Sequence, residues 1–240
     1  MNLNKLATQY HNKDFIKDDP IKFAHLYTKK TDIEISAFIS SWIAYGSRTQ
    51  ILKTLDKIHA EFMGSPTNYI KEKKYQNYKN QERCLYRFYQ EKDFFQLCET
   101  LHKILFEENF SCLEEKIQTL VSKKPTAIEV LEAITKIFPN QKGIPQNTKS
   151  ACKRLCLFLR WMVRKNSEVD FGIWQLLNEK DLIIPLDTHV FRLSKELSLT
   201  NRKQADMLSA IQITQNLKTT FPNDPLLGDY ALFGYGVNNK

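Results

Sequence analysis

Glycine and proline are scarce in this chain, which has seven glycines and eight prolines among 240 residues. A glycine-rich nucleotide-binding fold and an all-β sandwich both depend on many turns built from these residues, so neither is expected. The five cysteines form no CxxC pair and no cluster with histidine. An iron–sulfur cluster and a zinc site are therefore not expected, and the sequence predicts neither a metal ion nor an organic cofactor.

Long apolar runs and a signal peptide are also missing from the sequence. Together with the odd number of cysteines, their absence predicts a protein of the reducing cytoplasm that does not enter a membrane. Cys152 and Cys156 lie four residues apart on a predicted helix, and we expect both to be buried thiols. The composition, 42% hydrophobic and 26% charged, is that of a globular protein.

Positive charge is in excess, with a formal net charge of +8 and a pI of about 9.1. Counterion release drives basic proteins onto nucleic acid, so the charge favours a polyanionic partner. Charge alone does not distinguish a protein that binds a polyanion from a basic protein without such a partner.

Apolar residues recur at helical spacing along most of the chain, and no stretch shows sustained strand-like alternation. One apolar helical face runs over residues 35–43, and a second helix is predicted over residues 51–62. Residues 64–83 are basic and polar, which is typical of a solvated connector. We therefore predict an all-α protein.

Residues 141–165 contain seven Lys or Arg residues and no Asp or Glu. Their helix, predicted over residues 150–164, has an apolar face and a cationic stripe formed by Lys149, Lys153, Arg160 and Arg164. Such a stripe is ordinarily a solvated surface. The lack of nearby acids, and the isolated Asp187 that follows, favour a functional interpretation instead.

Asp187 is predicted to be the N-cap of a helix that continues through Val190 and Leu193. A capping aspartate usually has a structural role only. A carboxylate held at a helix N-terminus is nevertheless stabilised in its ionised form and can stabilise a developing cation. An amine within an apolar helical pattern is costly unless it has a partner, so we pair Lys153, as a nucleophile, with Asp187.

The segment LDTHVFR at residues 186–192 resembles the VDTHV-x-R segment of the helix-hairpin-helix DNA glycosylases. Residues 149–165, 169–174 and 182–193 together are similar to a bacterial family related to that superfamily, nearest among characterised enzymes to the archaeal 8-oxoguanine DNA glycosylases. DPIKFAH at 19–25, AYGSR at 44–48 and DYALFGYG at 229–236 extend the resemblance over nearly the whole chain.

The resemblance implies two helical lobes, residues 1–31 with 166–240 and residues 32–165, with a cleft between them for DNA and a flipped base. It makes Lys153 the Schiff-base lysine and Asp187 its catalytic partner. The implied activity is excision of 8-oxoguanine followed by β-elimination at the abasic site. The implied partner is double-stranded DNA carrying a damaged base, bound by a monomer that associates with the nucleoid while bound.

The resemblance also implies the binding residues. Asp229 and Phe233 match an acid and an aromatic that hold the base, while Leu157 stands where a second stacking aromatic is usual. The remaining substrate contacts would come from Tyr45, Arg48 and His25. The implied contacts to the DNA backbone are Lys149, Arg154, Arg160, Arg164 and His189.

Two alternatives stay open from the sequence. The hairpin at Gly143, Ile144 and Pro145 lacks the second glycine usual in these enzymes, so Lys149 remains an alternative to Lys153 as the nucleophile. The same departure would suit a non-catalytic helical protein that binds nucleic acid and has kept only the fold. A helical scaffold for protein interactions would explain neither the acid-free basic stretch nor Asp187.

Overall fold

The computed structural model describes residues 1–238 and consists mainly of helices. Helices account for 58% of the residues and strands for 3%, so the prediction of an all-α fold is confirmed. Among the described residues, the only sheet is a short antiparallel hairpin of two strands. No helix within residues 1–238 is long and apolar enough to cross a membrane.

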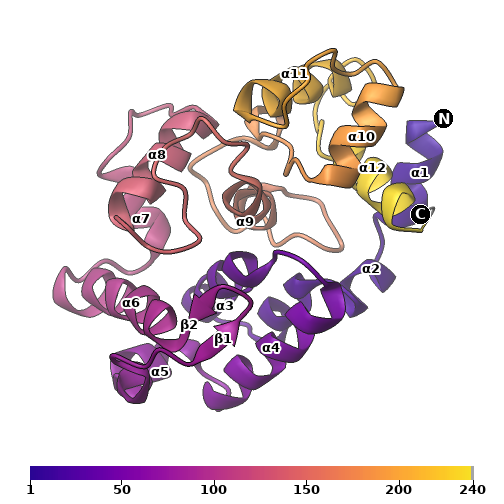
Figure 1. The fold of residues 1–240 in the computed structure, drawn as a ribbon. Coiled ribbons are helices and arrows are strands. Elements are labelled where there is room, and N and C mark those ends of the chain that lie inside the picture. The colour runs from indigo at the N-terminus through magenta and orange to yellow at the C-terminus, as the bar shows by residue number, and fades with distance from the viewer. Residues whose placement is uncertain (239–240) are drawn as a thin grey trace. The chain divides into compact units, whose positions relative to one another are not determined.

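The elements follow one another along the chain as shown in Figure 1. They are α1 (Leu3–Tyr10), α2 (Asp14–Lys17), η1 (Pro20–Leu26), α3 (Lys30–Ile43), α4 (Arg48–Glu61), α5 (Pro66–Lys71), η2 (Lys74–Tyr78), β1 (Cys84–Tyr86), β2 (Tyr89–Gln90), α6 (Glu91–His102), η3 (Lys103–Glu107), α7 (Leu113–Gln118), α8 (Ala127–Ile137), α9 (Lys153–Val163), η4 (Glu179–Asp181), α10 (Thr188–Glu196), α11 (Met207–Leu217) and α12 (Leu227–Asn238).

Two compact units divide the chain. The first unit contains Met1–Lys17, Lys124–Leu131 and the chain from Asn147 on, and the second contains Asp18–Lys123 and Glu132–Gln146. This division differs from the predicted lobes in three ways: Lys124–Leu131 belongs to the first unit, and two further segments also change sides. Helix α9 belongs to the same unit as α10 and α12, and η1 belongs with α3, because its apolar side chains are buried against that helix.

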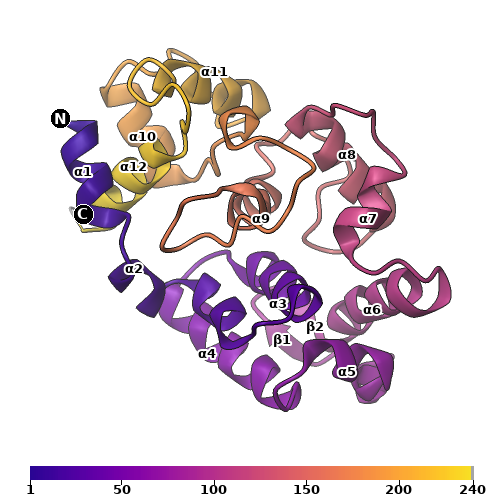
Figure 2. The ribbon, with the colours of Figure 1, turned by 180° about the vertical axis from the view of Figure 1, so that it is seen from behind.

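In the first unit, α12 lies against both α1 and α10, as Figures 1 and 2 show from opposite sides. Glycines on α12 allow this close approach. A Cβ at Gly234 would overlap the ring of Tyr10, and one at Gly236 would lie 3.0 Å from the Cβ of His189. Helix α10 is thereby held against α12, which fixes the position of its N-cap, Asp187.

In the second unit, α3 is the central helix, and nearly all of its side chains are buried. The helices predicted over residues 35–43 and 51–62 correspond to α3 and α4. The hairpin lies against the end of α3, where the hydroxyl of Tyr86 donates to the carbonyl of Tyr45 at 2.6 Å and that of Tyr89 donates to the carbonyl of Trp42 at 3.2 Å.

The basic segment at residues 64–83 is not a solvated connector, contrary to prediction. It forms α5 and η2, and its side chains Tyr69 and Tyr75 are buried. Their hydroxyls donate to carboxylates, Tyr69 to Glu61 at 3.0 Å and Tyr75 to Glu99 at 2.8 Å. Buried phenols need hydrogen-bond partners, and these two partners lie on α4 and α6. The segment is therefore tied to the core of its unit.

Candidate functional site

The side chains of Lys153 and Asp187 meet within the first unit. Asp187 is the N-cap of α10, as predicted, and its Oδ1 accepts the backbone N–H of Val190 at 2.9 Å. The other carboxylate oxygen, Oδ2, lies 3.5 Å from Nζ of Lys153. The Lys153 side chain is 31% exposed and that of Asp187 is 12% exposed. One oxygen thus caps the helix while the other faces an amine that solvent reaches.

The local sequence explains why this pair forms. Leu182, Ile184 and Leu186 are buried, which anchors the extended segment that leads into α10. Cys152 has a left-handed backbone (φ 46°), so α9 begins only at Lys153. The ammonium therefore lies at the positive end of the α9 dipole, an unfavourable position that a neighbouring carboxylate offsets.

Lys149 occupies a different position. The helix predicted over residues 150–164 begins later, at Lys153, so Lys149 precedes it by four residues. Its backbone carbonyl accepts the N–H of Met207 at 3.2 Å, which fixes the main chain. Its side chain is exposed and has no ion-pair partner within residues 1–238. The geometry thus pairs Lys153, and not Lys149, with Asp187.

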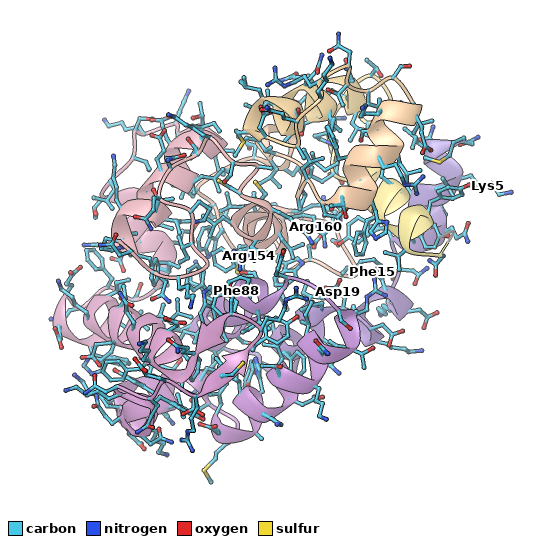
Figure 3. The ribbon with its side chains drawn as sticks, viewed as in Figure 1. Lys5, Phe15, Asp19, Phe88, Arg154 and Arg160 are labelled. Carbon is cyan, nitrogen blue, oxygen red and sulfur yellow. The ribbon has the colours of Figure 1, made fainter. Side chains whose placement is uncertain are left out.

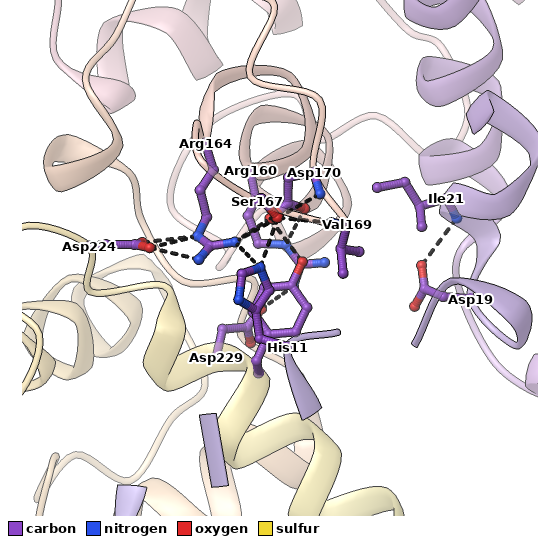
Figure 4. A network of polar contacts seen from close by, with 11 residues as sticks. His11, Asp19, Ile21, Arg160, Arg164, Ser167, Val169, Asp170, Asp224 and Asp229 are labelled. Atoms are coloured by element: carbon purple, nitrogen blue, oxygen red, sulfur yellow. Dashed lines mark hydrogen bonds and ion pairs between the residues drawn. The ribbon is translucent and has the colours of Figure 1, made fainter. Parts of the chain in front are cut away.

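Arg160 and Arg164 are buried, at 2% and 1% exposure. The prediction that they contact a DNA backbone is therefore wrong. Arg160 donates to Asp229 at 2.5 Å and to Asp170 at 3.3 Å. Arg164 donates to Asp170 at 2.8 Å and through its Nε to both oxygens of Asp224, at 3.0 and 2.9 Å. Figure 4 shows this buried ion network.

Tyr230 completes the buried ion network. Its hydroxyl donates to Asp170 at 2.8 Å, and the guanidinium carbons of Arg160 and Arg164 lie 4.4 and 5.2 Å from its ring centroid. Charges removed from water require this kind of pairing, because an unpaired buried ion is very costly. In Figure 3, Arg160 lies inside beside α9, whereas Lys5 extends outward from α1.

Burial shifts the pKa of two groups in this region. It raises the pKa of Asp229 to about 6, against the opposing effect of Arg160 and with smaller additions from Asp187 and Asp170. It lowers the pKa of His11 to about 4, with Arg164 contributing. Arg164 lies 2.9 Å from Nε2 of His11 and can donate to it when the imidazole is neutral.

The base-binding role predicted for Asp229 does not fit its surroundings. Asp229 is 2% exposed, and its Oδ2 accepts from Arg160, so the carboxylate lies inside the protein and is already paired with a cation. Phe233 is half-buried, with its ring 6.2 Å from that of Phe15. Leu157 is half-buried on α9. Both side chains are thus only half-buried, and their contact with a base stays a prediction.

The other predicted binding residues are spread over both units. Arg154 and His189 are partly exposed and belong to the first unit, near the starts of α9 and α10. Tyr45, Arg48 and His25 belong to the second unit. Tyr45 is 46% exposed rather than part of the core, with its ring 5.7 Å from Phe88 and 5.0 Å from the guanidinium of Arg87.

Sequence reasoning missed the acids of the buried ion network: Asp170 lies just beyond the acid-free stretch, whereas Asp224 and Asp229 follow some 60 residues later. A signal for burial was nevertheless present. Arg160 continues the four-residue spacing of Cys152 and Cys156, both of which are buried as predicted, and Arg164 extends that spacing by one more turn. Two arginines in register with an apolar stripe predict buried cations, which then need acidic partners.

Within residues 1–238, no group of three or more His, Cys, Asp or Glu side chains is arranged to hold a metal ion. The fold and the site together define an all-α protein in which an accessible lysine amine faces a carboxylate, next to a buried ion network. The chain belongs to the family described as "Protein of unknown function (DUF2400)", whose model matches residues 19–238. No curated protein and no solved structure matches the chain significantly.

Proposed function

We propose that this protein is a DNA repair glycosylase with lyase activity, which excises an oxidised purine, 8-oxoguanine, through a Schiff base on Lys153. The observation that carries the proposal is the distance of 3.5 Å between Nζ of Lys153 and Oδ2 of Asp187. A lysine amine next to a group that can accept its proton is an arrangement suited to covalent catalysis. The resemblance of residues 186–192 to the glycosylase segment supports the same reaction.

In the proposed reaction, the target nucleotide is turned out of the duplex, because its sugar carbon cannot be reached inside the stack. The nitrogen of Lys153 forms a bond to C1′ as the bond from C1′ to the base breaks, and the base leaves with the electron pair. Asp187 stabilises the positive charge that develops on the sugar and accepts the proton that the amine loses. Asp187 is well held for this role, because Val190 fixes its other oxygen.

The covalent intermediate then becomes an iminium between Lys153 and C1′ when the bond from C1′ to the ring oxygen breaks, and that oxygen takes up a proton as the sugar opens. Loss of a proton from C2′ breaks the bond between C3′ and its phosphate oxygen, which nicks the strand. Water finally releases the sugar fragment from the lysine. None of these three steps consumes an oxidant or a reductant, so the proposal requires no redox partner for the amine and the carboxylate.

DNA contacts in this proposal come from exposed cations, since Arg160 and Arg164 are buried. Lys149 is exposed and Arg154 is partly exposed, and both lie close in sequence to the start of α9. The net charge of +8 supplies the general attraction to a polyanion. In the second unit, the exposed ring of Tyr45 can stack on a base, and Arg48 can contact a phosphate.

Borohydride trapping on a panel of duplexes tests the proposal. One duplex carries 8-oxoguanine, one an abasic site, and one only normal bases. We expect a covalent adduct with the first two duplexes, with loss of the adduct in Lys153→Gln and its retention in Lys149→Gln. Loss in Lys149→Gln alone would make Lys149 the nucleophile. A gel shift on all three duplexes without any adduct would favour the non-catalytic nucleic-acid-binding protein.

A further inference from the structure

Helix α12 contacts both of the helices that carry the Lys153–Asp187 pair. Its residues Asp229 and Gly236 are seven positions, about two helical turns, apart and so lie on one face of α12. Asp229 accepts from Arg160 of α9, and Gly236 lies against α10. Lys153 is the first residue of α9, and Asp187 caps α10. The distance between the amine and the carboxylate therefore depends on how closely α10 packs on this face of α12.

The contact at Gly236 leaves no room for a side chain. A Cβ at this position would lie 3.0 Å from the Cβ of His189 and 3.0 Å from Cδ1 of Leu193. Carbon atoms pack best at about 3.5–4.0 Å, so such a Cβ would force its neighbours apart. The Cβ of His189 is bonded to the main chain, and a change of rotamer cannot move it away. A side chain on Gly236 would therefore push on the first turn of α10.

Asp187 moves with that first turn. Its Oδ1 accepts the N–H of Val190 at 2.9 Å, which fixes the carboxylate to the start of α10. Its Oδ2 lies 3.5 Å from Nζ of Lys153, which is on a different helix. Helix α9 is tied to α12 separately, through Arg160 and Asp229. A shift of α10 on α12 would therefore change the distance from Oδ2 to Nζ instead of carrying Lys153 along.

We infer that Gly236 is a positioning residue of the Lys153 site. Because it has no side chain, it lets α10 approach α12 closely enough for Asp187 to reach Lys153. Gly236 is buried and acts through α10, without contact to the reacting atoms. The effect of Gly236 on the reaction rests on the proposed function, whereas its effect on the distance between the two side chains exists without DNA.

Gly236→Ala tests this inference by two measurements. In crystal structures of the wild type and the variant, grown under the same conditions without DNA, the distance from Oδ2 to Nζ should lengthen beyond 3.5 Å in the variant. Single-turnover excision of 8-oxoguanine should slow by roughly tenfold, because a misplacement of about 1 Å can cost on the order of 100-fold and the required shift is about half as large. Duplex affinity should stay that of the wild type, since Gly236 is buried.

Gly228→Ala is the matched control on the same helix. A Cβ at Gly228 would lie 2.5 Å from Cδ2 of Leu217, at the end of a side chain on α11. Helix α11 carries neither Lys153 nor Asp187. This variant should therefore keep the wild-type distance between those two side chains and the wild-type rate of excision. If both glycine variants slow excision in proportion to their loss of melting temperature, Gly236 is only a packing residue and the inference is overturned.

A pair of leucine variants carries the test if Gly236→Ala does not fold. Leu193 contacts α12 at Gly236 and Leu217 contacts it at Gly228, and both leucines are buried. Leu193→Ala and Leu217→Ala each leave a cavity beside α12 and should lower the melting temperature. Only Leu193→Ala loosens α10, so it should slow excision severalfold while Leu217→Ala excises at the wild-type rate. Equal rates for the two variants would overturn the inference.

The two measurements on Gly236→Ala separate this inference from the proposed function. If no duplex is cleaved but the distance from Oδ2 to Nζ lengthens, the proposed function fails and the inference about Gly236 stands. An unchanged distance in the folded variant would overturn the inference whatever the duplexes show. A longer distance with an unchanged rate of excision would overturn the role of Gly236 in the reaction.

Discussion

Asp187→Asn separates the two roles of Asp187, because its two oxygens do different things. Oδ1 accepts the N–H of Val190 at 2.9 Å, and Oδ2 faces Nζ of Lys153 at 3.5 Å. Asparagine keeps an oxygen at the first position and replaces the second with an uncharged amide. The substitution should therefore preserve the helix cap while removing the negative charge next to the amine.

The expected magnitudes follow from these contacts. Loss of a cap costs about 1 kcal/mol, but asparagine caps about as well as aspartate, so the stability change should be well below that. For a protein of this size the melting temperature should then change by less than about 4 °C. An electrostatic group of this kind is worth on the order of 100-fold or more in rate. Single-turnover excision should slow by at least that factor.

Asp206→Asn is a matched control for this experiment. Asp206 caps α11 with nearly the same backbone angles as Asp187, and its Oδ1 accepts the N–H of Ser209 at 2.9 Å. Its other oxygen lies 2.7 Å from Arg202 instead of a lysine. Excision and thermal melting are measured on the same preparations. If Asp187→Asn melts normally and excises at the wild-type rate, Asp187 only caps its helix, and the proposed mechanism is refuted.

Two further predictions concern the buried ion network. Asp170→Asn breaks contacts to Arg160 and Arg164 and should lower the free energy of unfolding by about 3–5 kcal/mol, or the melting temperature by roughly 6–20 °C. The control Asp14→Asn, at an exposed position, should melt like the wild type. Equal melting of Asp170→Asn and the wild type would mean that the pairing contributes little to stability. His11 takes up a proton near pH 4 when folded and near 6.5 when unfolded, so its share of the stability falls as the pH drops from 6.5 to 4. His11→Gln should lose less stability over this range than the wild type in denaturant titrations, and parallel losses would contradict this reason.

Local patterns in the sequence were sufficient for much of the fold. Helical spacing predicted α3 and α4, and the capping preference of aspartate predicted the start of α10 at Asp187. The contact between Lys153 and Asp187 was inferred from the lack of acids near the lysine. The helices and the cap depend on residues within one or two helical turns. The Lys153–Asp187 pair was inferred from two separate stretches, each of which is unusual by itself.

Long-range pairing was beyond the reach of such patterns. The resemblance assigned Arg160 and Arg164 to DNA contacts, but in the folded chain Asp170, just beyond the acid-free stretch, and the distant Asp224 and Asp229 pair with them. Which acid pairs with which arginine depends on how α9, α12 and the loops between them pack. A buried cation can be suspected from sequence, whereas its partners come only from the structure.

Solvated connectors are equally hard to predict from polarity alone. The segment at residues 64–83 is rich in lysine, yet Tyr69 and Tyr75 bury their rings and donate to Glu61 and Glu99. Tyrosine has an apolar ring with a polar hydroxyl, so it can enter a core whenever a carboxylate is available inside. The partners lie on α4 and α6, on either side of the segment in sequence, and no local pattern identifies them.

Identification of the trapped residue tests the central claim most directly. The wild-type protein is incubated with an 8-oxoguanine duplex and borohydride, digested with a protease and nuclease, and the peptide that carries the sugar remnant is sequenced by mass spectrometry. We predict a reduced adduct on Lys153, which no other lysine replaces at comparable yield. An adduct on Lys149, or on lysines scattered over the surface, would contradict the assignment of Lys153 and Asp187 as the reacting pair.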